Sequence, residues 1–180
     1  MNISNISSSP VQQFNWNALV LALVTFWFSS SAFLDFLLMP MMYETGMMNE
    51  PNFATAGYSI FWLFNRVELL CGAAILSGLL VIRQRALNLN REFSVIASGS
   101  RSRWALLLSG ALLAIAFTFT YGLTPQMSAL GIHLNGTFTE PAPVAMGRLH
   151  LLYWSLETVK LFAAAWLIKL CYRDMNAAQC

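Results

Sequence analysis

Four long apolar segments constrain the fold of this chain more than any other feature of its sequence. They cover approximately residues 17–39, 58–82, 104–123 and 147–170. A helix needs roughly 20 apolar residues to cross a hydrocarbon core, and in lipid the helix satisfies its own backbone hydrogen bonds. The sequence therefore predicts an all-α integral membrane protein, an antiparallel bundle of four transmembrane helices.

The composition supports a single membrane domain. Hydrophobic residues make up 57% of the chain and charged residues 10%, whereas about a quarter of a soluble domain is charged. The net charge of +2 is too small for a nucleic-acid partner. We expect a polar N-terminal tail at 1–16, a transmembrane domain at 17–171 and a short C-terminal tail at 172–180. Because the first tail has no positive charge, we interpret the segment after it as a retained helix.

The distribution of basic residues predicts the orientation. The loop between the second and third segments has one acid, Glu92, against Arg83, Arg85, Arg91, Arg101 and Arg103. The loops after the first and third segments carry acidic residues and no Lys or Arg. Because positive loops stay cytoplasmic, we expect both termini in the cytoplasm.

A stripe of ionisable residues follows one side of the fourth segment. At 100° per residue His150, Tyr153 and Glu157 lie within about 60° of one another, and Lys160 follows Glu157 by three residues. Ionisable side chains within the membrane are costly and often functional. The predicted intramembrane polar network comprises Asp35, Asn65, Arg66, Glu68, His150, Tyr153, Glu157 and Lys160.

Depth along the helices suggests how these groups pair. Arg66 and Glu68 are 200° apart and face different neighbours, whereas Asn65 and Glu68 share a face. We expect pairs such as Arg66 with Glu157, and Asp35 or Glu68 with Lys160. Asp35 either lies near the headgroups, within reach of water, or pairs with Arg66 or His150. The network either fixes helix register or forms a proton path or ligand site.

Prolines, serines and tryptophans complete the predicted helices. We expect Pro40 to end the first helix and Thr124-Pro125 to close the third. Ser29, Ser30 and Ser31 would let a neighbouring helix approach closely. The aromatic residues expected on exposed faces are Trp27, Trp62 and Trp166.

Enzyme motifs are missing from the sequence, but a methionine-rich loop suggests metal chemistry. There is no Gly-rich phosphate loop, paired CxxC or HExxH, so we predict no catalytic residues. Thioethers select Cu(I), and the candidate metal ligands are Met41, Met42, Met47, Met48 and His133. The alternative is that methionine fills irregular packing at the interface.

Scattered positions along nearly the whole chain resemble a known family. They are Met39-Pro40, the aromatic-rich stretch at 53–64, Thr124-Pro125, and Arg148-Leu149-His150. The chain resembles a four-helix membrane family of unknown function that includes transmembrane protein 205, and FNRVELL looks like its cyanobacterial branch. The resemblance implies a bacterial inner membrane or thylakoid location. Where the family has Ser and Asn, this chain has Tyr153 and Glu157.

Three functions follow from these observations. The first is a non-catalytic accessory protein that binds, assembles or stabilises a larger membrane complex, such as a photosynthetic one, or a homo-oligomer. A remoter similarity to the copper-resistance inner-membrane protein D and to membrane protoporphyrinogen oxidase implies the second, an oxidoreductase-like protein with His150 as ligand of haem b, or a copper site. The third is transport or tolerance of a metal or small solute.

Overall fold

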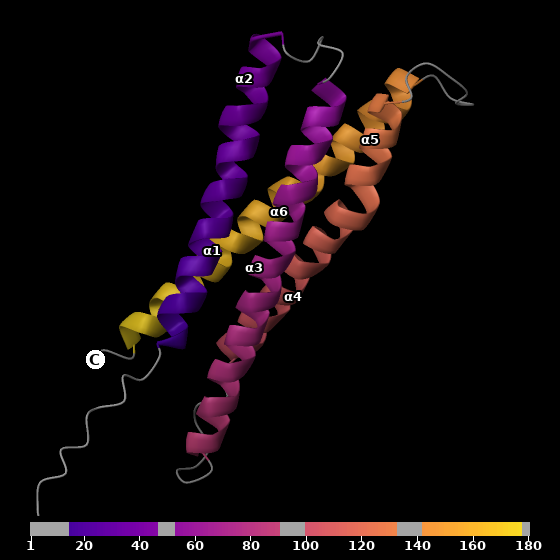
Figure 1. Ribbon diagram of the computed structural model, residues 1–180. Helices are drawn as coiled ribbons and strands as arrows, with labels where there is room; N and C mark the ends of the chain where they lie inside the picture. The colour runs from indigo at the N-terminus through magenta and orange to yellow at the C-terminus, as the bar shows by residue number, and fades with distance from the viewer. Residues whose placement is uncertain (1–14, 47–52, 91–99, 133–141, 178–180) are drawn as a thin grey trace, which may run out of the picture.

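A computed structural model describes residues 15–46, 53–90, 100–132 and 142–177, and these residues are helical apart from short ends. The elements are α1 (Trp16–Phe33), the π-helical turn η1 (Leu34–Leu38), α2 (Met39–Glu44), α3 (Phe53–Asn90), α4 (Ser100–Thr118), the second π-helical turn η3 (Phe119–Leu123), α5 (Thr124–Ile132) and α6 (Ala142–Ala177). Because α1, η1 and α2 follow one another without a break, as do α4, η3 and α5, the chain forms four rods (Figure 1).

Each rod is long and apolar enough to cross a membrane. The candidate spans are Trp16–Glu44, Thr55–Arg85, Arg103–Leu130 and Val144–Arg173. The predicted all-helical architecture, with four helices long and apolar enough to cross a membrane, is therefore confirmed for the described residues. Helix α6 continues to Ala177, beyond the last residue predicted for the transmembrane domain.

The four rods pack as a ring rather than as a layer. Helix α1 packs on α3 and α6, and α4 packs on the same two helices. Within the described ranges, the backbones of α1 and α4 do not approach each other closely, and neither do those of α3 and α6. The helices α3 and α6 therefore stand on a diagonal of the bundle, and they meet only through long side chains.

The two ends of the bundle differ in packing. We call the end with Arg83, Arg85 and Arg103 the arginine end, and the end with Met39 and Met41 the methionine end. Near the arginine end α1 and α6 pack together, and they diverge towards the methionine end (Figure 1). At the methionine end α2 directly continues η1, and it packs on no other described element.

The prediction that helices end at Pro40 and at Thr124-Pro125 is wrong, because each proline follows a π-helical turn. The N–H of Met39 donates to the carbonyl of Leu34, and the N–H of Thr124 donates to the carbonyl of Phe119. Both bonds reach back five residues. Proline lacks an N–H and its ring clashes with the carbonyl four residues earlier. The wider π turn displaces that carbonyl, so the helix continues.

Apolar side chains fill the centre of the bundle towards the arginine end. We call this set the apolar block; its members are at most 4% exposed and are Val20, Val24, Ile75, Leu112, Ala164 and Leu167. Two glycines of α3 bring α1 close. A Cβ at Gly78 would lie 2.6 Å from Cγ2 of Val20, and one at Gly72 would lie 3.4 Å from the Trp27 ring.

Candidate functional site

Polar residues continue the buried face of α1 into the π turn η1. Trp27, Ser31 and Asp35 follow one another at intervals of four residues, and each is at most 3% exposed. Residues at this spacing share a helix face. Asp35 lies inside η1, and π-helical turns are frequent at functional sites.

Glu68 on α3 receives three hydrogen bonds at one oxygen. Its Oε1 accepts from Trp27 Nε1 at 2.8 Å, from Ser31 Oγ at 3.0 Å and from Lys160 Nζ at 2.5 Å. Its Oε2 is buried and accepts none from the described residues. Hydrogen bonds with a charged partner are stronger than neutral ones, so these contacts tie Glu68 to α1 and to α6.

Lys160 on α6 lies between two carboxyl groups. Besides Glu68, its Nζ lies 2.8 Å from Oε2 of Glu157, which precedes it by three residues. The ammonium group is also 5.1 Å from the centroid of the Phe119 ring, within the range of a cation–π interaction. The pair of Lys160 with Glu68 thus crosses the diagonal between α6 and α3.

Asp35 bonds to Tyr153 on the methionine side of this pair. The Tyr153 hydroxyl donates to Oδ1 of Asp35 at 2.8 Å, and its ring lies 5.2 Å from that of Phe119. Glu157 follows Tyr153 by four residues and so lies on the same face of α6, towards Asp35. These contacts join three rods into one ionisable cluster, which consists of Trp27, Ser31, Asp35, Glu68, Tyr153, Glu157 and Lys160.

Negative charge exceeds positive charge in this cluster. Three carboxyl groups and one amine are at most 3% exposed. Glu157 is the least satisfied member, because neither of its oxygens accepts a hydrogen bond from a described residue and its contact with Lys160 is an ion pair alone. Burying a charge is costly unless it is both paired and hydrogen-bonded, and the Glu157 carboxyl has the pair alone.

The structure places the remaining predicted residues outside the cluster. Asn65 is buried, but its Nδ2 donates to Thr124 Oγ1 at 2.6 Å and so ties α3 to α5. His150 is exposed, and its Nδ1 lies 3.0 Å from the carbonyl oxygen of Met146 on the same helix. The stripe on α6 therefore faces the interior only from Tyr153 onward.

Only some of the predicted ion pairs form among the described residues. Glu68 pairs with Lys160, as expected. The pair of Arg66 with Glu157 is not formed, because Arg66 is exposed and its guanidinium stacks 3.9 Å from the centroid of the Trp62 ring. Asp35 is buried and bonds to Tyr153 rather than to Arg66 or His150.

Two cluster residues were not predicted. Trp27 was expected on an exposed face and is 3% exposed, whereas Trp62 and Trp166 are 44% and 63% exposed. Ser31 was expected only to allow close helix packing, and it also bonds Glu68. The spacing of four residues back from Asp35 is the sequence signal that identifies both.

The structure adds no support for a metal or haem. Among the described residues no group of three His, Cys, Asp or Glu side chains is arranged to hold a metal ion. Met41 is exposed and Met42 half-buried, and the other three predicted ligands, Met47, Met48 and His133, lie outside the described residues. Haem ligation by His150 and copper binding stay predictions.

Comparison with protein-family models, with curated proteins and with solved structures finds no match for this chain. The resemblance to the family of transmembrane protein 205 therefore stays an expectation.

Proposed function

We propose that this protein binds and releases a proton within the membrane, at the neighbouring carboxyl groups of Asp35 and Glu157. One observation carries the proposal: the bundle buries three carboxyl groups with a single amine, and the oxygens of Glu157 accept no hydrogen bond from the described residues. On this proposal the protein is a proton-coupled membrane protein rather than an enzyme.

We propose that the proton resides on Glu157, because its surroundings differ from those of the other two carboxyl groups. Glu68 accepts three hydrogen bonds at Oε1, one of them from the Lys160 ammonium. Asp35 accepts a hydrogen bond from the Tyr153 hydroxyl. Glu157 has only its ion pair with Lys160, and its oxygens accept no hydrogen bond from the described residues.

A proton fits this site better than a metal ion does. The Lys160 ammonium occupies the position between Glu68 and Glu157 where a cation would bind. A divalent ion needs several oxygen ligands around one point. With the amine in place, the cluster can gain a proton on a carboxyl group without any rearrangement of the helices.

The apolar block favours proton exchange with the methionine end. The cluster begins at Asp35 and Tyr153 on that side, whereas Val24, Ile75 and Leu167 separate it from the arginine end. By the arginine distribution, the methionine end is the outer face and both termini are cytoplasmic. We therefore place proton uptake on the outer side of a bacterial inner or thylakoid membrane.

Infrared spectroscopy tests the proposal. The protein, reconstituted in lipid, is titrated with pH in H2O and D2O, and the band of a protonated carboxyl C=O is recorded. We expect a band that shifts in D2O, disappears at high pH, and is lost in Glu157→Gln. Glu44→Gln, at an exposed position of the methionine end, is the matched control and keeps the band.

The outcomes separate the two carboxyl groups. If only Asp35→Asn removes the band, the proton resides on Asp35 instead of Glu157, and the site is still this pair of carboxyl groups. A band that survives in Glu157→Gln, in Asp35→Asn and in the double variant contradicts the proposal. So does a wild-type protein without a protonated carboxyl band at any pH.

A second observation favours the accessory role. Helix α2 packs on no described element except η1, and exposed apolar side chains cover this arm, including Phe36, Met41 and Tyr43. A helix of a larger membrane complex would cover them. We expect the intact chain to co-purify with such a complex in mild detergent. Recovery of a lone monomer, with all complexes unchanged in a deletion strain, would exclude this role.

A further inference from the structure

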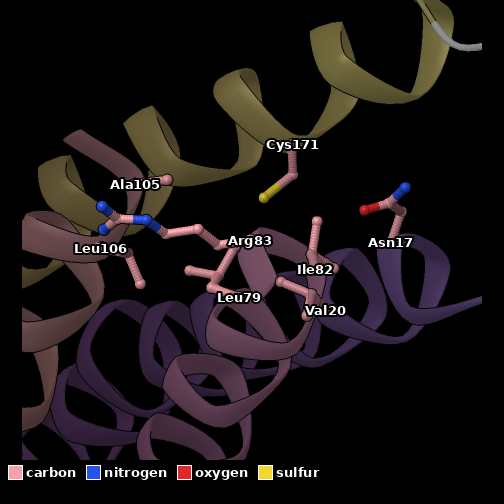
Figure 2. Close-up of a pocket in the computed structure, with 8 residues that line it drawn as sticks. All are labelled: Asn17, Val20, Leu79, Ile82, Arg83, Ala105, Leu106 and Cys171. Atoms are coloured by element: carbon pink, nitrogen blue, oxygen red, sulfur yellow. The ribbon is translucent and has the colours of Figure 1, made fainter. Parts of the chain in front are cut away.

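A cavity lies where the four rods meet at the arginine end. Its volume is about 80 Å³, and since about 10–15 Å³ accommodates one water molecule, it has room for a group of several heavy atoms. All four rods contribute to its lining, which consists of Asn17, Val20, Leu79, Ile82, Arg83, Ala105, Leu106 and Cys171 (Figure 2).

Arg83 makes this cavity chemically distinctive. Its side chain extends along the cavity towards Ala105 and Leu106, with the amide of Asn17 on the opposite side (Figure 2). No acidic side chain in the described ranges forms an ion pair with Arg83. A guanidinium group against apolar walls favours an anion, and its planar donors match a phosphate at two points.

The position of the cavity identifies the source of that anion. The second span ends at Arg85 and the third begins at Arg103, so Arg83 lies at the level of the lipid headgroups. The ring of Trp16, a residue type enriched at this level, lies 5.9 Å from the Arg85 guanidinium. Exposed Arg85 and Arg103 add positive charge around the cavity, and positive charge at this level attracts anionic lipid.

We infer that this cavity binds the phosphate of an anionic phospholipid, with the Arg83 guanidinium as the donor group. The cavity is large enough for the phosphate and too small for the acyl chains, which stay in the surrounding leaflet. The apolar block lies between this site and the ionisable cluster, so the inference is independent of the proton proposal.

Thermal unfolding of the delipidated, full-length protein in mild detergent tests the inference. Phosphatidylglycerol is titrated against wild type, Arg83→Gln and Arg103→Gln. A ligand of the native state raises the unfolding midpoint as its concentration exceeds Kd. We expect a saturable rise in wild type and in Arg103→Gln, and its loss in Arg83→Gln. Arg83→Lys keeps the charge, so we expect it to retain part of the rise in the unfolding midpoint. It replaces Arg83→Gln as the test variant if Arg83→Gln fails to fold.

Three results would overturn the inference. An equal rise with phosphatidylcholine of the same acyl chains would show that the headgroup charge is not recognised. An equal rise with inorganic phosphate alone would assign the cavity to a free anion. If Arg83→Gln and Arg103→Gln lose the phosphatidylglycerol-dependent rise equally, the lipid is attracted by the overall positive charge of the arginine end and not bound in the cavity.

Discussion

The two halves of the bundle use the same helices for opposite kinds of core. Towards the arginine end, the buried faces of α1, α3 and α6 present Val20, Ile75 and Leu167. Towards the methionine end, the same faces present Asp35, Glu68 and Glu157. The change occurs at the same depth on all three helices, which is why the polar residues meet.

This difference shows that a small bundle can place its close apolar packing in one half and its buried ionisable groups in the other. The apolar block is closely packed, which the absence of side chains at Gly72 and Gly78 permits. The ionisable cluster is held by directed bonds and keeps unbonded carboxyl oxygens. We expect substitutions in the two halves to differ in size and in their dependence on charge.

The largest effect should come from Lys160→Met, which removes the one buried amine. It leaves Glu68 without its ion-pair partner, and breaking a buried pair in this way costs about 3–5 kcal/mol. Unfolding in mixed micelles measures the change in free energy. Lys169→Met, at an exposed position of the same helix, is the control and should change little. Adding Glu68→Gln to Lys160→Met should recover part of the loss; no recovery would contradict a pairwise role.

Leu112→Ala should follow, because it opens a cavity in the apolar block. Leu112 is 0% exposed, and truncating a buried leucine costs about 2–5 kcal/mol. The same unfolding assay applies, with Leu107→Ala on the exposed face of α4 as control. Equal losses for the two would mean that the block is not a packed core.

We expect Tyr153→Phe to cause a smaller loss in the free energy of unfolding. The ring contact with Phe119 remains, but Asp35 loses its donor, and an unsatisfied buried group costs about 1–3 kcal/mol, more when it is charged. Tyr121→Phe, which removes a hydroxyl from a ring that is 67% exposed, provides the comparison. If Tyr153→Phe were neutral, Asp35 would have to be reached by water.

The smallest effect belongs to Ser31→Ala, which removes one of three donors to Glu68. A typical hydrogen bond contributes about 0.5–1.5 kcal/mol net, and the two remaining donors limit the damage. Ser29→Ala, two residues earlier and exposed, should be neutral within error. A loss as large as that of Lys160→Met would mean that the hydroxyl, not the amine, is the main partner of Glu68.

Sequence reasoning predicted the four long apolar helices and, within the site, the ion pair of Glu68 with Lys160. Length and hydropathy determine a transmembrane helix, so the four spans were predicted. The pair of Glu68 with Lys160 followed from helix geometry and depth. The partner of Asp35 and the role of Trp27 depend on which helices are neighbours, and single-helix periodicity contains no such information. The helices continue through Pro40 and Pro125 because π turns precede them, and propensity rules assume regular α-helix.

The diagonal position of the pair formed by Lys160 and Glu68 has a mechanical consequence. Four rods joined only along the sides of a square can shear into a rhombus with little change at any side. A strut across one diagonal prevents that movement, and in this bundle the strut is electrostatic. On the proposed function, a proton on Glu157 would remove the other carboxylate that competes for the Lys160 ammonium, so proton uptake would strengthen the strut and stiffen the frame.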